Sequence, residues 1–253
     1  NSIDGDGAEG LSGWYWGHSK GAAKVAEEDS ETAYMTDRAM QFVTEAGDEP
    51  WVMHLSYIKP HWPYIAPEPY ASMYRAEDVV PVVRDGSEQC DPHPVYAAFM
   101  RHKDSRLYDR PEARETIIPA YMGLIKQIDD HIGRLMGFLE GRGQLEDTMI
   151  VFTSDHGDNL GDHWLGEKDL FHEPSIRLPM IVVDPRAEAD GTRGTSDGRF
   201  VEAIDMVPTF VQAAGGAVQS HRMEGRSLLP LLHGQAVKWR DYVICESDYS
   251  GRP

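Results

Sequence analysis

Cysteine, long apolar runs and basic residues are all scarce in this sequence. Two cysteines among 253 residues are too few for a disulfide framework, which favours a reducing, cytoplasmic location and leaves the periplasm open. The longest apolar run, Leu178 to Val183, has six residues, whereas a membrane-spanning helix needs about 20. The 24 lysines and arginines face 42 aspartates and glutamates, a formal net charge of −18. Nucleic acid and anionic membranes favour basic surfaces, so neither is expected as a partner.

The composition is otherwise that of a folded protein. Hydrophobic residues make up 41% of the chain and charged residues 26%, which excludes disorder as the main state. No repeat or linker divides the sequence, so we expect a single domain over residues 1–253. A polar, glycine-rich opening and an ending without a closing element indicate that this domain is incomplete, with residues 242–253 or so beginning a C-terminal portion.

The hydrophobic pattern predicts strands that alternate with helices. Helices are expected from Ser30 to Ala46, Ala120 to Glu140 and Ile204 to Ala214, with Pro119 in the first turn of the second. Strands are expected over Trp51–Tyr57, Thr148–Phe152, Pro179–Val183 and Tyr242–Glu246. Residues 1–22 are expected to be loop, and residues 71–114 a long loop or a helical excursion. This alternation predicts an α/β fold with a mainly parallel sheet and helices on both of its faces.

Two polar clusters follow predicted strands, where sites form in parallel sheets. Asp155 and His156 come just after one strand and His61 just after another. Oxygen and imidazole donors together suit Mn²⁺, Zn²⁺ or Fe²⁺, and Mg²⁺ or Ca²⁺ less well. A turn with a helix-capping aspartate would explain Asp155 equally well.

Further along the chain, Lys168 stands between Glu167 and Asp169. Taken alone, this pattern is more typical of a surface lysine in a salt bridge than of a catalytic group. His163 and His172 lie nearby, and no role is assigned to either.

Several motifs in this order resemble the sulfatase family of alkaline phosphatase-like hydrolases. They are Thr153-Ser-Asp-His-Gly-Asp-Asn-Leu-Gly-Asp-His163 followed by Gly166-Glu-Lys168, His54-Leu-Ser-Tyr-Ile-Lys-Pro-His-Trp-Pro-Tyr64, Ile128-Asp-Asp-His-Ile-Gly133, Pro174-Ser-Ile-Arg-Leu-Pro-Met-Ile-Val182, Asp205-Met-Val-Pro-Thr209 and Gly225-Arg-Ser-Leu-Leu-Pro230. Within the family, the Lys59–Tyr70 stretch and the Ser-Asp-His-Gly form look most like the phosphonate monoester hydrolase branch.

The resemblance implies an alkaline phosphatase-like core and assigns roles to four residues. Asp155 and His156 would be two ligands of one divalent metal ion (Mn, Ca, Mg or Zn). Lys168 would contact the non-bridging oxygens of the transferred group. His61 would donate a proton to the leaving oxygen or a hydrogen bond to the charged group. These roles agree with the charge that spreads over the equatorial oxygens in such transfers.

The nucleophile of the family has no counterpart here. It is a cysteine oxidised to formylglycine in Cys-x-Pro-x-Arg, which precedes the segment that matches His61. Cys90-Asp-Pro-His-Pro94 has proline in place of the arginine and follows that segment. The resemblance therefore implies a formylglycine in a missing N-terminal part, and we expect the chain alone to be inactive.

Three functions are compatible with these residues. The first is metal-dependent hydrolysis of phosphonate monoesters or phosphodiesters, so that the partner is a small anionic ester. The second is a sulfatase that hydrolyses sulfate esters, and the third is a sulfatase-like binding domain without catalysis. Trp62 and Tyr64 could stack on an aryl leaving group, although packing is the commoner role of such loop aromatics. A homo-oligomer is left open.

Overall fold

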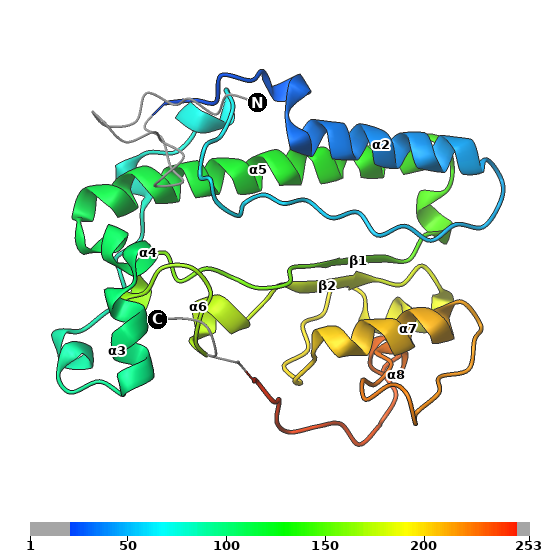
Figure 1. Cartoon of the computed structure of the whole chain (residues 1–253). Coiled ribbons are helices and arrows are strands. Elements are labelled where there is room, and N and C mark those ends of the chain that lie inside the picture. The colour runs from blue at the N-terminus through cyan, green and yellow to red at the C-terminus, as the bar shows by residue number, and fades with distance from the viewer. Residues whose placement is uncertain (1–20, 247–253) are drawn as a thin grey trace. The chain divides into compact units, whose positions relative to one another are not determined.

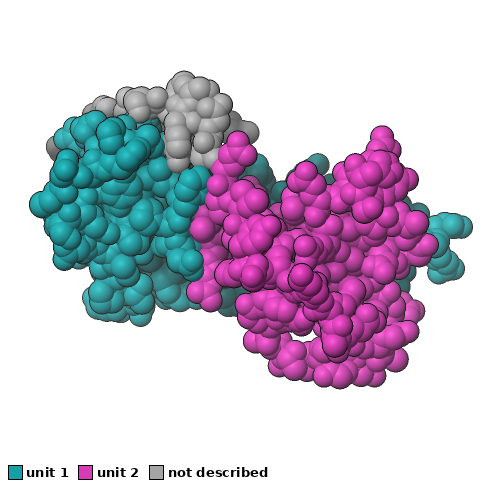
Figure 2. Space-filling view, turned by 90° about the horizontal axis from the view of Figure 1, so that it is seen from below, with its two compact units in different colours: residues 1–145, 158–175, 253 teal, residues 146–157, 176–252 magenta. Residues whose placement is uncertain are grey.

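The computed structural model describes residues 21–246 of the chain. The chain divides into two compact units, one of residues 1–145, 158–175 and 253 and the other of residues 146–157 and 176–252 (Figure 2). The first unit contains α2 (Glu31–Ala46), α3 (Pro94–Arg101), α4 (Lys103–Arg106) and α5 (Pro111–Gly141).

None of the helices between residues 21 and 246 combines the length and the apolar character of a membrane-spanning segment. The single domain expected from the sequence stays a prediction.

Helices α2 and α5 run side by side in the first unit (Figure 1). The start of α2 is set by Ser30, whose Oγ accepts a hydrogen bond of 3.2 Å from the Ala33 N–H and so satisfies one of the open donors of the first turn. His131 of α5 is buried, and its Nε2 lies 2.5 Å from Glu27, which precedes α2. The Ser30–Ala46 helix is therefore confirmed almost to the residue, and buried polar contacts as well as apolar ones join it to α5.

The long helix begins earlier than the sequence predicts. Pro119 was expected in the first turn, but α5 begins at Pro111 and Pro119 lies inside it. A proline inside a helix removes one backbone hydrogen bond. Here Pro119 is buried, as are its neighbours Ile117 and Ile118, and this burial offsets the loss. The expected boundary at Ala120 was wrong because packing outweighed the local preference.

The core of the first unit gathers around the start of α5. Its buried members are Tyr64, Leu107, Tyr108, Ala113, Ile117 and Ala120. Of the alternatives for residues 71–114, the helical excursion is correct, since α3 and α4 fall inside that range. Tyr64 brings the loop of His61 onto this core, so the position of that loop depends on packing far along the chain.

The second unit contains a sheet of two strands. They are β1 (Ile150–Thr153) and β2 (Met180–Val183), and the unit also holds α7 (Met206–Ala213) and α8 (Leu229–Leu232). The strands pair antiparallel, with Ile150 opposite Val183. The expected parallel arrangement is wrong for this pair. Parallel neighbours need a crossover, usually a helix, and residues 154–179, all described, contain no α-helix longer than the four residues of α6 (Glu173–Ile176).

Two further predicted strands are not formed in the described chain. Residues 51–57 alternate between half-buried and exposed side chains, as in a strand with one solvated face, but residues 21–246 offer them no partner in a sheet. Tyr242–Glu246 is exposed and irregular. Both predictions followed from apolar composition, whereas a strand also requires a neighbour for its backbone hydrogen bonds.

A buried carboxylate, that of Asp205, holds several segments of the second unit together. Asp205 is fully buried, and its two oxygens each lie 2.7 Å from a guanidinium nitrogen of Arg240. The backbone N–H groups of Glu202 and Arg226 donate to the same carboxylate. The Asp205–Thr209 motif found in the sequence therefore has a structural role, because it joins three segments by charge-assisted hydrogen bonds.

Candidate functional site

Lys168 and His61 lie together in the first unit, although 107 residues separate them in the chain. Lys168 Nζ is 3.2 Å from His61 Nε2. A lysine ammonium has no lone pair, so it donates and the ring nitrogen accepts. His61 Nδ1 is 2.9 Å from the carbonyl oxygen of Trp62 and must donate to it. These contacts assign His61 as a neutral imidazole with its proton on Nδ1 and its lone pair on Nε2.

Lys59 holds the loop of His61 in place. Its Nζ donates to the carbonyl oxygen of Pro63 at 2.8 Å and to that of His61 at 3.4 Å. Burial lowers the pKa of Lys59, and the nearby Glu31 opposes this effect. No sequence pattern identified Lys59, because the carbonyl groups that it binds converge only in the folded loop.

The loop that carries Lys168 has a tightly constrained backbone. Left-handed φ values occur at Gly161 and at five residues with side chains: Leu160, His163, Trp164, Glu167 and Leu170. Such conformations are costly for residues with a Cβ and persist only where the surroundings fix them. A Cβ on Gly166 would collide with the carbonyl group of Asp104, and the Gly166 N–H donates to Ser105 Oγ at 3.1 Å. The loop is thus fastened to α4.

The salt bridge expected for Lys168 as a surface lysine is present but long. Its Nζ lies 3.8 Å from Glu167 Oε2, whereas the contact with His61 is 3.2 Å. About 30% of the Lys168 side chain is exposed. The ammonium group is therefore directed at His61 and stays accessible to an anion.

Asp155 and His156 lie in the second unit, just beyond β1. Asp155 Oδ1 accepts a hydrogen bond of 3.0 Å from the His156 N–H. His156 Nδ1 is 2.8 Å from the carbonyl oxygen of Gly157, and His156 Nε2 is 3.7 Å from Asp155 Oδ2. The Asp155 side chain is 87% exposed, and it caps no helix, because the next helical turn begins only at Asp162, with Gly161 at its N-cap position.

This arrangement fits a pair of metal ligands. Because Nδ1 donates to a backbone carbonyl, the ring lone pair is on Nε2, and such a contact is the usual support of a histidine ligand. Nε2 and the Asp155 carboxylate are near enough to share an ion. Over residues 21–246, no group of three or more histidine, cysteine, aspartate or glutamate side chains is arranged to hold a metal.

The two loop aromatics differ in their surroundings. Tyr64 is 4% exposed and belongs to the core of the first unit, and its Oη donates to Asp158 Oδ2 at 2.5 Å. The packing interpretation is therefore correct for Tyr64. Trp62 is 40% exposed, and its ring centroid is 5.3 Å from that of His61, so its face remains accessible beside the imidazole.

The histidines to which the sequence assigned no role form a cluster of their own. The rings of His163 and His172 stack with centroids 4.1 Å apart, and His163 Nδ1 is 2.7 Å from Glu88 Oε1. Burial lowers the pKa of His172, as does the neighbouring His163, and Glu88 opposes both. For Glu88, burial raises the pKa, but the hydrogen bond to His163 and further contacts outweigh it and lower the pKa overall. Tyr96 closes the cluster with a ring contact to His172.

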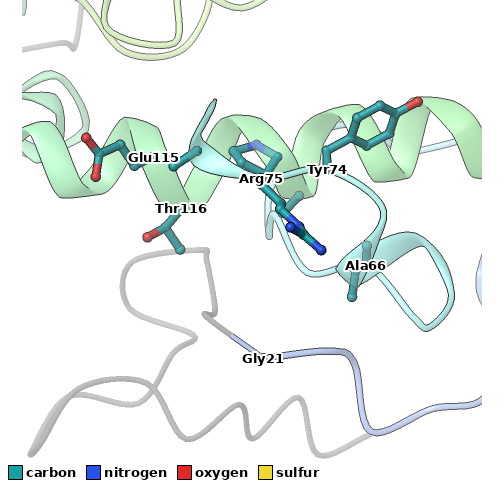
Figure 3. Close-up of a pocket in the computed structure, with 10 residues that line it drawn as sticks. Gly21, Ala66, Tyr74, Arg75, Glu115 and Thr116 are labelled. Atoms are coloured by element: carbon teal, nitrogen blue, oxygen red, sulfur yellow. The ribbon is translucent and has the colours of Figure 1, made fainter. Parts of the chain in front are cut away.

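A pocket of about 190 Å³ lies elsewhere in the first unit, along α5 (Figure 3). Arg75 and Glu115 are its charged lining residues, and none of the four candidate residues Asp155, His156, His61 and Lys168 borders it. Cys90 is exposed, with Sγ 3.6 Å from the carbonyl oxygen of Gly86. No cationic group or base contacts this thiol among the described contacts, so nothing around it resembles the setting of an activated nucleophile.

A family model described as Sulfatase matches residues 7–217, most of the chain. The chain belongs to the sulfatase family. This sulfatase-family chain is 33% identical over 241 residues to the multifunctional alkaline phosphatase superfamily protein PehA of Trinickia caryophylli, a match that covers 90% of the chain and 46% of PehA. It is 30% identical over 223 residues to an arylsulfatase of Clostridium perfringens, with 86% and 45% covered.

Among solved structures, the phosphonate monoester hydrolase of Agrobacterium radiobacter superimposes with a TM-score of 0.84 at 28% identity, over 99% of this chain and 51% of that one. The α/β, alkaline phosphatase-like class expected from the sequence is thereby confirmed for a partial core, although the described strand pair is antiparallel. The chain spans about half the length of the curated relatives that it matches.

Proposed function

We propose that the protein containing this chain hydrolyses phosphonate monoesters or phosphodiesters in a metal-dependent reaction. Its membership of a hydrolase family supports the reaction class, and the similarity to a phosphonate monoester hydrolase supports the substrate class. One observation carries the proposal for this chain: the 3.2 Å contact between Lys168 Nζ and His61 Nε2. It places a fixed positive charge and a proton-transfer group side by side, which ester hydrolysis at an anionic centre requires.

In this mechanism the two side chains act on different oxygens of the substrate. The Lys168 ammonium binds a non-bridging oxygen of the substrate and so releases the lone pair on His61 Nε2. A proton taken up from solvent then binds to Nε2, because Nδ1 keeps its own proton for the carbonyl oxygen of Trp62. Nε2 then donates to the leaving oxygen, while Nδ1 holds the ring in orientation.

Asp155 and His156 would supply two ligands of the metal ion. When bound, the ion would polarise the phosphoryl oxygens and neutralise developing charge. His156 would bind through Nε2, because Nδ1 is engaged with Gly157.

The nucleophile would be a formylglycine outside these 253 residues. The coverage of about half of each relative is compatible with this, and the surroundings of Cys90 give no support to a nucleophile within the chain. Hydrolysis of sulfate esters is the second candidate function, favoured by the match to an arylsulfatase. Phosphonate monoesters, phosphodiesters and sulfate monoesters all present a tetrahedral monoanion, so the charge of the site alone does not separate them.

The test compares full-length enzyme variants on aryl phosphonate, phosphodiester and sulfate esters that share one leaving group. Lys168→Ala and His61→Ala should each lower kcat by about 10²- to 10³-fold, because each removes a fixed contact to charge that develops in the transition state. Lys126→Ala is the matched control, since this lysine of α5 pairs with Asp129 and Asp130 instead.

Phosphonate or phosphodiester turnover should exceed sulfate turnover in kcat/KM. A tenfold lead for the sulfate ester, about 1.4 kcal/mol in barrier height, would favour the sulfatase instead. If kcat in Lys168→Ala and His61→Ala equals that of the control, the assigned roles are wrong.

A further inference from the structure

Asn159 is hydrogen-bonded to the backbone on both sides of Lys168. Its side chain is almost completely buried, with 1% of the residue exposed. Its backbone N–H donates to the carbonyl oxygen of Glu167 at 2.7 Å, and its Nδ2 donates to the same oxygen at 2.8 Å. Nδ2 also reaches the carbonyl oxygen of Asp169 at 3.4 Å. One residue therefore holds the carbonyl groups on both sides of Lys168.

Ser175 completes the same arrangement. It is 3% exposed, and its Oγ contacts the carbonyl oxygen of Lys168 itself and, at 3.3 Å, that of Leu170. Four successive carbonyl oxygens, from residue 167 to residue 170, thus accept hydrogen bonds from Asn159 or Ser175. These contacts fix the backbone over a stretch in which Glu167 and Leu170 hold left-handed φ angles, which persist only where the surroundings constrain them.

The amide of Asn159 has one unfavourable feature. Its Oδ1 is buried and has no hydrogen-bond partner in the described structure. A buried acceptor without a partner costs about 1–3 kcal/mol. The orientation is retained because Nδ2 alone can donate to the carbonyl groups of Glu167 and Asp169, whereas the flipped amide would place oxygen against oxygen. The side chain therefore donates through Nδ2 to both carbonyl groups, while its Oδ1 accepts no hydrogen bond in the described structure.

We propose that Asn159 is a positioning residue for Lys168, and that Ser175 assists it. Asn159 fixes the backbone on either side of Lys168, which directs the ammonium group to its place 3.2 Å from His61 Nε2. The inference rests on the proposed function only in taking Lys168 as the residue that contacts substrate. A misplacement of about 1 Å can cost as much as 10²-fold in rate, so a residue without contact to the substrate can affect the reaction strongly.

The decisive variant is Asn159→Asp in the full-length enzyme. Aspartate has the same shape, but it replaces the Nδ2 donor with an oxygen that repels both carbonyl groups. We expect kcat on an aryl phosphonate ester to fall by about 10- to 100-fold, with a smaller change in KM. Gln127→Glu is the matched control: Gln127 is also 1% exposed, and its amide donates to Glu27 and Ser30, away from the Lys168 loop. This control should lose thermal stability and keep its kcat.

A double-mutant cycle with Lys168→Ala distinguishes failure of the positioning role of Asn159 from failure of the proposed function. If Asn159 acts through Lys168, the double variant should be no slower than Lys168→Ala alone. Effects that multiply, or an Asn159→Asp enzyme with the kcat of wild type beside a slow Lys168→Ala enzyme, would overturn the positioning role. A Lys168→Ala enzyme with unchanged kcat would instead refute the proposed function.

Ser175→Ala provides the test should Asn159→Asp fail to fold, as judged by circular dichroism. It removes the hydroxyl contact with the Lys168 carbonyl group and leaves Asn159 in place. We expect a several-fold lower kcat, which should again vanish in the Lys168→Ala background. An unchanged kcat in Ser175→Ala under those conditions counts against the proposal.

Discussion

The hydroxyl group of Tyr64 donates a hydrogen bond of 2.5 Å to Asp158 Oδ2. Tyr64 comes three residues after His61, and Asp158 comes two residues after His156. The other carboxylate oxygen, Oδ1, accepts from the Leu160 N–H at 3.0 Å. A buried phenol in the core of the first unit thereby fixes the start of the loop that carries Lys168. Burial and the nearby Tyr108 and Asp158 raise the pKa of Tyr64, so it remains a donor at any ordinary pH.

Tyr64→Phe should reduce the free energy of unfolding by about 1–3 kcal/mol, because it leaves a partly buried carboxylate oxygen without its donor while the ring keeps its packing. The measurement is chemical denaturation of the full-length protein. Tyr34→Phe is the control, since Tyr34 is 60% exposed. Equal stabilities of the two variants would mean that Asp158 finds an alternative donor.

The stability of the first unit should depend on the ionisation of Glu27. Burial raises the pKa of Glu27, but hydrogen bonds from His131 and Gln127 outweigh it, and the pKa is lowered overall. A glutamate ordinarily titrates near pH 4.3. The unfolded chain therefore binds its proton at higher pH than the folded chain, so this stabilisation is complete above about pH 4.3 and is lost as the pH falls through the lower folded pKa.

Glu27→Gln should accordingly be less stable than wild type at pH 7, and the difference should shrink as the pH is lowered toward 3. Thermal melting curves recorded at several pH values measure both quantities. Glu28→Gln, an exposed neighbour, should follow the wild-type profile. A constant gap between Glu27→Gln and wild type would indicate a contribution from packing without ionisation.

The sequence predicts the parts of this fold that depend on local chemistry. Ser30 sets the start of α2 because a hydroxyl oxygen can cap a helix without help from the rest of the chain. The start of α5 was missed because Pro119 is accommodated by burial, which a local pattern does not contain. Trp51–Tyr57 has the apolar residues of a strand, but a strand also depends on a neighbouring segment.

In the candidate site, too, the features that depend on neighbouring residues could be predicted and those that depend on distant segments could not. Asp155 and His156 are adjacent in sequence just after a predicted strand, so their position made a metal pair possible, and the family resemblance favoured it over a capping turn. His61 and Lys168 were linked by family resemblance, since no pattern relates residues 107 positions apart. Asn159, Lys59 and Ser175 escaped notice because their partners are backbone carbonyl groups, which look alike in every sequence.

Asp155 and His156 should be required for metal binding in the full-length protein. Asp155→Ala and His156→Ala each remove one of the two donors that we propose for this chain, so the bound divalent ion should fall well below one per protein at limiting metal. Loss of a group that only hydrogen-bonds to a metal ligand commonly lowers metal affinity by about 10- to 100-fold, so the loss of a direct ligand should cost at least that. Elemental analysis after dialysis and calorimetric titration provide the readout.

Asp147→Ala is the control for these two variants, because Asp147 is exposed in the same segment, before β1. It should retain the stoichiometry of wild type. Unchanged stoichiometry and affinity in both Asp155→Ala and His156→Ala would show that these residues form an ordinary turn after β1.

Trp62 should favour substrates with an aromatic leaving group. Trp62 is 40% exposed and its ring lies beside the imidazole of His61, so an aryl group bonded to the leaving oxygen could stack on the indole when that oxygen approaches Nε2. Aromatic contacts of this kind contribute about 0.5–1.5 kcal/mol beyond burial. In Trp62→Ala, kcat/KM for an aryl phosphonate should therefore fall about 2- to 12-fold further than kcat/KM for the matching methyl ester.

The methyl ester is the control within each variant, because a change in the loop that misplaces His61 would slow the hydrolysis of both esters alike. Trp62→Phe should restore much of the preference for the aryl ester. An equal loss of kcat/KM on the two esters would mean that Trp62 supports the His61 loop and does not contact the leaving group.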